Sequence, residues 1–327
     1  RYTMKSKVVK IYEQGSIDVL KIEETELRDI NSNEVLIKHE YAGLNFIDIN
    51  QRKGTYPIKK LPSIMGMEAS GSIIQIGSQV TKFKVGDKVT HCMNLGSFSN
   101  IMHILEDKVI KLNQSFDLKV AAASTLQGLT AQYLLNSSYK LKKGQVILMH
   151  AAAGGVGQIL CQWANKIGAT VIGTVSTKDK ELIAKQNGCH HTINYLKEDF
   201  KEKVLDITHN QGVDVIYDSV GKNTFLSGLR CLAPKGRLVS FGVSSGPIEP
   251  IDINTLRPIS GSISTGGLNT FIKKHDEMQK NANQLFELLY KDEIKVNISE
   301  IIPIDNIKQA QHKMENRLTT GSIVLSF

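Results

Sequence analysis

The sequence has few cysteines to form disulfide bonds or a zinc cage, and it has no long apolar run. Only four of its 327 residues are cysteines, and they lie far apart with no C-x-x-C pair. This usage fits buried thiols in a reducing compartment. No apolar run approaches the roughly 20 residues of a membrane-spanning helix, and the N-terminal stretch has no apolar core like that of a signal peptide. We therefore expect a cytoplasmic protein that does not associate with membranes, with Met4 as its natural first residue.

The net charge of +8 is the one property of the composition that suggests nucleic acid. However, the lysines are spread along the chain and most stand beside acidic residues, and no long basic run or aromatic–basic repeat occurs. A solvated, Lys-rich surface explains the charge, so nucleic-acid binding is not expected. The charge would still help to attract an anionic cofactor.

The most informative segment is residues 145–175. An apolar run at 146–149 predicts a buried strand, and the Gly-rich turn 152–157 (AAGGVG) follows at once. A helical pattern then ends at Gly168, and a second apolar run occupies 170–175. Strand, glycine turn, helix and strand form the layout of a dinucleotide-binding fold, in which the helix N-terminus receives a pyrophosphate. The alternative is a tight turn with a purely structural role.

The end of the second strand indicates which dinucleotide is bound. NAD sites usually place an acid about 20 residues into the motif, to hold the ribose 2′-hydroxyl. Here Ser176, Thr177, Lys178 and Lys180 follow the strand, and hydroxyl and ammonium groups suit a 2′-phosphate. Asp179 argues the other way, but an acid in the first turn of a helix also favours the helix dipole. We predict NADPH as the cofactor, with Lys180 as a ligand and Lys178 at a solvated surface.

The residue pattern that predicts secondary structure changes near residue 127. The earlier part has short runs broken by glycine and proline, which predicts a mostly β domain. Strands and helices then alternate, and the six predicted strands are the number in a complete doubly wound sheet. Because that sheet is already full, we expect the tail to return to the first domain. The six strands are predicted at 146–149, 170–175, 192–195, 213–218, 237–241 and 262–265, and helices at 180–187, 199–208, 223–231 and 276–291.

Several motifs resemble those of one known family. They are residues 43–48 (GLNFID), 52–57 (RKGTYP), 66–71 (GMEASG), 83–89 (FKVGDKV), 150–157 (HAAAGGVG), 217–221 (YDSVG) and 240–242 (SFG). Over nearly the whole chain they resemble the medium-chain dehydrogenase/reductase superfamily, and more narrowly its zinc-free quinone oxidoreductase branch, which includes zeta-crystallin.

The resemblance implies an α/β fold with two domains and a cleft between them. A GroES-like, mostly β catalytic domain would comprise residues 1–126 completed by 268–327, and a doubly wound Rossmann domain that binds NADP(H) would comprise 127–267. It also implies a homodimer formed largely by the Rossmann domains, whose edge strands would pair across the two-fold axis. Strand 262–265 is the candidate edge strand.

The resemblance also indicates that no metal is used. Zinc alcohol dehydrogenases of the superfamily have a cysteine where this chain has Asn45, and a histidine where it has Met67 before Glu68. An amide and a thioether are poor Zn²⁺ ligands. The four close cysteines of a structural zinc lobe are absent too, since Cys92 stands alone in that region.

The resemblance suggests two catalytic residues, Asn45 and Tyr56, near the nicotinamide. Tyr56 could hydrogen-bond or stack on a quinone; the alternative is a loop tyrosine packed beside Pro57. Quinones are electron-poor and need little electrophilic help, so the protein would mainly hold the nicotinamide against the ring and exclude water.

The predicted cofactor contacts come from several segments. For Thr130 and Tyr133 the alternative is helix packing, for Tyr195 it is strand capping, and for Arg317 it is interaction with a helix dipole. The full predicted set is Thr130, Tyr133, Gly154, Gly155, Val156, Gly157, Ser176, Lys180, Tyr195, Ser219, Phe241, Gly242, Ser244 and Arg317.

The predicted function is an NADPH-dependent quinone oxidoreductase. One alternative is a reductase of activated double bonds in enones or alkenals, which would use the same hydride. A non-enzymatic alternative is an RNA-binding or structural protein like zeta-crystallin, supported directly only by the basic composition.

Overall fold

The computed structural model describes residues 3–327. The first two residues, which the expected start at Met4 would exclude, lie outside that range. The chain divides into two compact units, which we call unit 1 and unit 2. Unit 1 comprises the residues up to Leu126 together with Ile272–Phe327, and unit 2 comprises Gln127–Phe271. The expected division placed 268–271 with the first domain, whereas these residues belong to unit 2, where the ring of Phe271 stacks on Tyr133.

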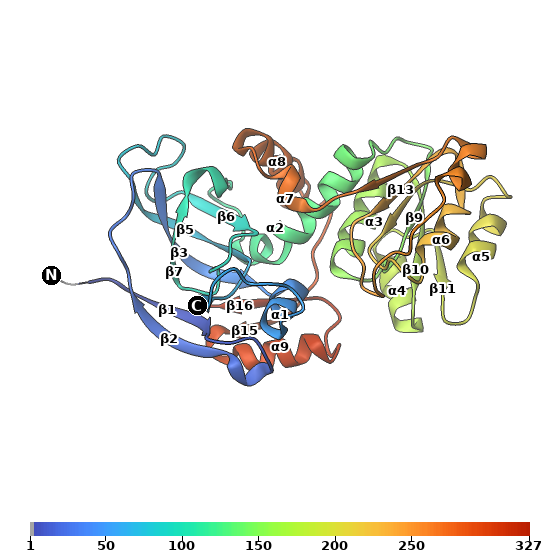
Figure 1. Ribbon diagram of the computed structural model, residues 1–327. Helices are drawn as coiled ribbons and strands as arrows, with labels where there is room; N and C mark the ends of the chain where they lie inside the picture. Colours follow the sequence, from blue (N-terminus) through green and yellow to red (C-terminus); the bar gives the residue numbers. More distant parts are fainter. Residues whose placement is uncertain (1–2) are drawn as a thin grey trace. The chain divides into compact units, whose positions relative to one another are not determined.

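Unit 1 is mostly β-structure, as expected (Figure 1). Within residues 3–327, a seven-stranded sheet has the order β15-β16-β3-β5-β6-β8, with β7 paired to β3, and a smaller sheet has the order β2-β1-β4. The strands are β1 (Lys5–Ile11), β2 (Lys21–Glu26), β3 (Glu34–Gly43), β4 (Ser63–Ile64), β5 (Glu68–Ile76), β6 (Lys88–Cys92), β7 (Ile101–Leu105), β8 (Ile110–Lys111), β15 (Ile298–Pro303) and β16 (Ser322–Ser326).

The C-terminal tail is built into the large sheet of unit 1. Strand β16 pairs antiparallel with β3, with Val324 opposite Gly43, and β15 pairs parallel with β16. Because β16 pairs with β3, this sheet can form only when residues about 280 positions apart meet. Its helices include α1 (Phe46–Lys53), α8 (His275–Tyr290) and α9 (Ile307–Glu315).

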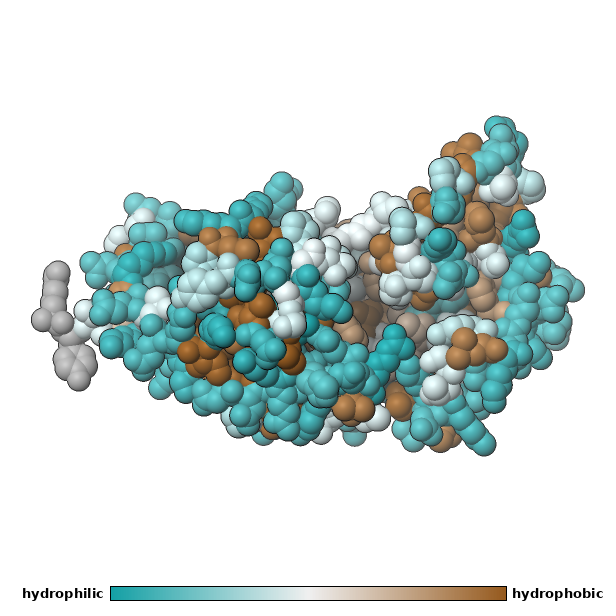
Figure 2. Space-filling model, turned by 60° about the horizontal axis from the view of Figure 1, so that its bottom comes forward, coloured by the Kyte–Doolittle hydropathy of each residue, from teal (hydrophilic) through white to brown (hydrophobic). Residues whose placement is uncertain are grey.

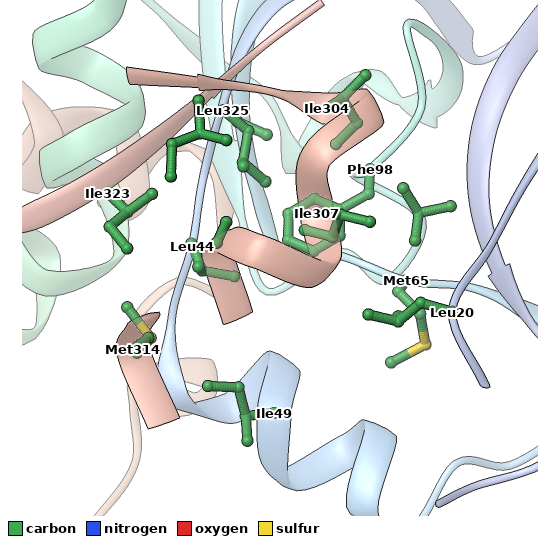
Figure 3. Close-up of a cluster of buried hydrophobic side chains, with 14 of the residues drawn as sticks. Leu20, Leu44, Ile49, Met65, Phe98, Ile304, Ile307, Met314, Ile323 and Leu325 are labelled. Carbon is green, nitrogen blue, oxygen red and sulfur yellow. The ribbon is translucent and has the colours of Figure 1, made fainter. Parts of the chain in front are cut away.

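A hydrophobic cluster joins the early strands and α1 to this tail (Figure 3). Side chains such as Leu44 and Ile49 pack with residues of α9 and β16, and full burial of each such side chain contributes about 1.5–3 kcal/mol. The labelled members are Leu20, Leu44, Ile49, Met65, Phe98, Ile304, Ile307, Met314, Ile323 and Leu325, and the most exposed of them, Met314, is only 8% exposed.

Unit 2 is a doubly wound α/β domain, and this prediction is confirmed (Figure 1). Its sheet has six strands within the described chain, ordered β11-β10-β9-β12-β13-β14, and every pairing is parallel. Counted within the sheet, this is the order 3-2-1-4-5-6 of a dinucleotide-binding fold. The strands are β9 (Val146–Met149), β10 (Thr170–Val175), β11 (His191–Asn194), β12 (Val213–Asp218), β13 (Leu232–Ser240) and β14 (Ser262–Thr265).

Several helix and strand ends differ from those predicted. Strand β13 begins five residues earlier than expected, at Leu232, with a register shift that the pattern did not reveal. Strand β11 ends at Asn194, so Tyr195 lies just beyond it. Helix α6 is shorter than predicted, because Gly221 adopts a positive φ of 87° and Thr224 is the N-cap. The other helices are α2 (Leu118–Tyr133), α3 (Gly155–Ile167), α4 (Lys178–Gln186), α5 (Phe200–Ile207), α6 (Phe225–Leu229) and α7 (Leu268–Phe271).

The surface is largely hydrophilic on the face shown in Figure 2, with smaller hydrophobic areas between polar ones. Many lysines are paired with acids, as in Lys185–Glu181 and Lys291–Glu287. Within residues 3–327, no helix combines the length and the apolarity needed to cross a membrane.

Candidate active site

The glycine turn of unit 2 leads from β9 into the first turn of α3. Its N-cap is Gly154, so the cap residue has no side chain to occupy the first N–H groups of the helix. A Cβ at Gly157 would overlap the carbonyl oxygen of Ala151 and lie 2.7 Å from that of Ala152, so the backbone leaves room only for glycine. A Cβ at Gly154 would meet only the Ala151 oxygen, at 3.2 Å. The open side of the turn is therefore at Gly154, where a phosphate can approach the helix N-terminus.

Gly155 has a different reason to be glycine. A Cβ there would overlap the side chain of Gln127, which comes from α2 of the same unit. Packing against Gln127 is therefore a second reason for a glycine at position 155, in addition to the predicted phosphate contact. The sequence pattern alone does not separate the two reasons.

The residues predicted to bind a 2′-phosphate lie together at the end of β10. The Nζ atom of Lys180 donates a hydrogen bond of 3.2 Å to Oγ of Ser176, and Thr177 caps α4. The backbone N–H of Tyr195 donates to the carbonyl of Val175, and the Tyr195 side chain is 50% exposed. Two side chains that could bind an anion and an exposed ring are therefore gathered at one strand end. Lys178 is exposed, as expected for a solvated lysine.

The loops after β12 and β13 form a second cluster of predicted residues. The N–H of Phe241 donates to Asp218, the last residue of β12, and the N–H of Ser244 donates to the carbonyl of Ser219. A Cβ at Gly242 would stand 3.0 Å from that same Ser219 oxygen. The four predicted residues Ser219, Phe241, Gly242 and Ser244 therefore lie side by side at the carboxyl end of the sheet, where ligands bind in folds of this kind.

The two predicted residues of α2 are buried. Tyr133 is 2% exposed and its ring stacks on Phe271 at 4.4 Å between centroids, while Thr130 is 8% exposed. Burial raises the pKa of Tyr133 to about 12. The Tyr133 ring therefore packs within unit 2, as the alternative interpretation expected. Cofactor contact by Thr130 or Tyr133 stays a prediction.

In unit 1, Asn45 is held at the start of α1. It is the N-cap residue, it is 6% exposed, and its backbone N–H donates to Oδ2 of Asp48 at 2.7 Å. Its side-chain Nδ2 donates to Oε1 of Glu68 at 2.9 Å. Hydrogen bonds therefore fix both the backbone and the side-chain amide of Asn45.

Tyr56 lies just beyond the other end of α1. Its backbone N–H donates to the carbonyl of Asn50, and its own carbonyl accepts from Nε2 of Gln14 at 3.0 Å. The backbone is thus anchored while the side chain remains 45% exposed, which leaves the ring accessible to a ligand.

Two buried carboxyl groups beside Asn45 were not predicted from the sequence. Glu68 is 2% exposed and Asp48 is fully buried. Burial raises the pKa of Glu68 to about 8, against the opposing effect of its hydrogen bonds, and burial also raises the pKa of Asp48 well above its ordinary value. A signal for Glu68 exists in the sequence, because this acid begins the largely apolar strand Glu68–Ile76.

Arg317 follows α9 and lies in unit 1. It is exposed and adopts a positive φ of 55°, so its side chain is available to a ligand. The helix before it is anchored by Arg52, which is 2% exposed and donates to Oε1 of Gln311 at 2.7 Å and to the carboxylate of Glu315. Arg52 was not predicted, because its partners lie about 260 positions away.

Comparison with known proteins gives the family. Residues 31–135 match the model described as the alcohol dehydrogenase GroES-like domain, and residues 155–287 match that described as zinc-binding dehydrogenase. A quinone oxidoreductase of Pseudomonas aeruginosa is 38% identical over 323 residues, which are 98% of this chain and 99% of the relative. The chain belongs to the quinone oxidoreductase branch of the medium-chain dehydrogenase/reductase superfamily.

Two further members show how closely the fold is shared. The crystal structure of the Escherichia coli quinone oxidoreductase in complex with NADPH has a TM-score of 0.92 and 37% identity, with 98% of this chain and 100% of that one covered. A 2-haloacrylate reductase from a Burkholderia species is 37% identical over 323 residues, covering 96% of this chain and 97% of the relative.

Despite the description of one matching model, no group of three potential metal ligands occurs among residues 3–327 of this quinone oxidoreductase-family protein. At the two positions where zinc alcohol dehydrogenases have ligands, Nδ2 of Asn45 donates to Glu68, and the sulfur of Met67 accepts from Nε2 of Gln51 at 3.7 Å. Both side chains thus have partners within the protein.

Proposed function

We infer that this protein is an NADPH-dependent quinone oxidoreductase that transfers hydride to quinones without a metal ion. The observation that carries the inference is full-length similarity, at 36–38% identity, to proteins named quinone oxidoreductase in Pseudomonas aeruginosa, Escherichia coli and Salmonella typhimurium. The two clusters at strand ends in unit 2 and the Asn45 cluster in unit 1 support it.

The residues of unit 2 suit NADPH. The pyrophosphate would be held at Gly154, Gly155, Val156 and Gly157, where the turn is open at Gly154 and the helix N-terminus favours an anion. Lys180 and Ser176 already share a hydrogen bond and would hold the 2′-phosphate, with Tyr195 beside them. When bound, the cofactor supplies the hydride and its electron pair.

The other cofactor contacts are proposed at the remaining strand ends and helices. The loop pair Ser219–Ser244 and the adjoining Phe241 and Gly242 would border the nucleotide at the carboxyl end of the sheet. The proposed set is completed by Thr130, Tyr133 and, from unit 1, Arg317, whose exposed guanidinium would bind an anionic part of the cofactor.

In unit 1, Asn45 and Tyr56 are proposed to meet the reacting rings. Asn45 is nearly buried and oriented by its bonds, so it can hold a ring without losing much conformational freedom. Tyr56 offers a hydroxyl and an aromatic face, either of which can contact a quinone. Because the reduced quinone is a stabilised phenolate, water suffices as its proton donor.

A substrate panel tests the proposal. Purified protein should oxidise NADPH in the presence of benzoquinone or naphthoquinone, and should use NADPH at least tenfold more efficiently than NADH. Steady turnover of alkenals with no turnover of either quinone would contradict it, as would calorimetry showing no binding of either nicotinamide cofactor.

A second candidate function is reduction of an activated carbon–carbon double bond. The similarity to a 2-haloacrylate reductase, at 37% identity over nearly the full length of both proteins, favours this candidate. The same panel should therefore include 2-chloroacrylate and an enone. A kcat/KM for either above that for the quinones would make double-bond reduction the main activity.

We also propose that the protein forms a homodimer through the edge of the unit 2 sheet. Strand β14 lies at that edge and, among the described strands, pairs only with β13, which leaves a row of backbone groups available to a second copy. Light scattering after size-exclusion chromatography should give the mass of a dimer, and a monomer at micromolar concentration would contradict the proposal.

A further inference from the structure

Glu68 is enclosed by backbone from two other elements of unit 1. It begins β5, and its neighbours are Gly43, at the end of β3, and Ala122, in α2. A Cβ at Gly43 would overlap both Oε1 of Glu68 and the carbonyl oxygen of Ala122. The chain therefore has a glycine where the carboxylate needs space, which indicates that the position of this carboxylate is closely defined.

Both oxygens of Glu68 accept hydrogen bonds. Oε1 accepts from Nδ2 of Asn45 at 2.9 Å, and Oε2 accepts from the backbone N–H of Leu126 at 2.6 Å. A backbone bond from Thr125 adds to these and, like them, lowers the pKa against burial. An ionised carboxylate is an acceptor only and suits all these donors, whereas a protonated carboxyl adds an O–H donor and makes that oxygen a weaker acceptor.

The bond to Asn45 determines which way the amide faces. If the amide were turned over, its oxygen would face the Glu68 carboxylate, and the two acceptors would repel each other. With Nδ2 held by Glu68, the other end of the Asn45 amide has a single orientation. This matters only if that amide contacts the reacting rings, so the inference below rests on the function proposed above.

We propose that Glu68, acting as a carboxylate, is a positioning residue that holds the Asn45 amide in its working orientation. Asp48 on α1 and Cys92 on β6 are the titratable groups that interact with Glu68, and burial raises the pKa of both. The activity should therefore depend on the ionisation of Glu68, and this dependence should disappear when Glu68 can no longer ionise.

The experiment compares Glu68→Gln with wild type at several pH values, using naphthoquinone and NADPH. A glutamine accepts from Leu126 with its oxygen but presents an N–H₂ group to Asn45, so the Asn45 amide must turn over. We expect kcat to fall about 10- to 100-fold, with the KM for NADPH changed less than threefold. In wild type kcat should rise with pH through about 8, and this rise should vanish in Glu68→Gln but persist in Asp48→Asn.

Glu106→Gln is the matched control. Glu106 is 8% exposed, lies in unit 1 and accepts from the backbone N–H groups of Thr81 and Lys82, so its replacement disturbs a similar carboxylate away from Asn45. Its kcat and pH profile should match wild type. Asn45→Ala should lose as much kcat as Glu68→Gln, and the double variant should lose no more than the worse single variant.

Wild-type kcat and an unchanged pH profile in Glu68→Gln would overturn the inference, and so would losses that multiply in the double variant. If Glu68→Gln does not fold, Asn45→Asp examines the same pair, because two facing carboxylates would make activity fall with rising pH; a wild-type pH profile there would also overturn it. A wild type that reduces no quinone contradicts the proposed function instead, so the two failures are distinguishable.

Discussion

The two units of this protein build their parts of the candidate site by different means. In unit 2 the predicted groups are backbone N–H groups at a helix N-terminus and side chains at strand ends, each near its neighbours in sequence or on an adjacent strand. In unit 1, Arg52 reaches partners about 260 positions away, and the Asn45–Glu68 pair lies among side chains that are nearly fully buried.

This difference explains why the site residues of unit 2 are easier to predict from the sequence than those of unit 1. A nucleotide can be bound largely by backbone geometry, which glycine and proline patterns record in the sequence. An oriented amide and a buried carboxyl group need a low-polarity enclosure made by several elements, and burial is what changes their chemistry. The comparison predicts that changes in unit 1 cost more stability and changes in unit 2 cost more cofactor affinity.

The largest expected effect is on stability, from Arg52→Ala. The change would leave Gln311 and Glu315 without their buried partner and would remove the hydrogen bonds that join α1 to α9. We expect the free energy of unfolding to fall by about 3–5 kcal/mol, measured by urea denaturation. The control is Lys313→Ala, on the same helix, because its partly exposed bond to Glu300 should be worth less than about 1 kcal/mol. Equal losses in both variants would contradict the assignment of Arg52 as the main link.

Next is the glycine turn, where Gly157→Ala and Gly154→Ala make a matched pair. The Cβ at residue 157 would overlap backbone oxygen, which cannot move aside easily, so about 2–4 kcal/mol of stability should be lost together with NADPH binding. The Cβ at residue 154 has more space and should leave the stability within about 1 kcal/mol while weakening NADPH binding. Calorimetry and urea denaturation measure the two effects, and a reversed order would contradict the geometry of the turn.

A smaller effect on affinity is expected from Lys180→Glu. The substitution places an anion beside Ser176, where we propose the 2′-phosphate to bind, so the Kd for NADPH should rise about 10- to 100-fold. The Kd for NADH should change less than threefold, because NADH lacks that phosphate. Lys178→Glu, two residues away on the exposed surface, should change neither by more than threefold. Equal losses for both cofactors in Lys180→Glu would remove the 2′-phosphate role.

The smallest expected effect is a pH dependence of stability in unit 1. A hydrogen-bonded ion pair with Arg28 lowers the pKa of Glu34 to about 2. Because the folded pKa lies below the unfolded one, the pair stabilises the protein above about pH 4.5 and loses its effect as the pH falls towards 2. Glu34→Gln should therefore cost about 1–2 kcal/mol at pH 7 and much less near pH 2, where Glu34 is about half protonated. A difference from wild type that does not change with pH would contradict this.

Burial gives Glu68 the opposite sign. Its folded pKa, about 8, lies above the unfolded value, so this group makes stability fall as the pH rises from about 4.5 to 8. The pKa values of these two glutamates thus shift in opposite directions. Glu34 has a cation beside it, whereas Glu68 has only neutral donors and a low-polarity enclosure.

Much of unit 2 could be predicted from its amino-acid pattern. The six strands were expected in the right order along the chain, and β14 was expected at the residues where it lies. The missed boundaries, such as the early start of β13 and the short α6, depend on a register shift and on the turn at Gly221, which hydrophobic periodicity does not record. The pattern around Tyr133 likewise could not reveal that Phe271 covers its ring.

The sequence by itself determined the class of the protein, the glycine turn and the cationic end of β10, because these depend on local backbone geometry and on residues close together along the chain. Only the tertiary structure decided that Glu68 faces Asn45 and that Arg52 joins α1 to the C-terminal helix. Such contacts require β3, β5 and β16 to meet in one sheet, and the burial that follows is a property of the whole unit and of no single segment.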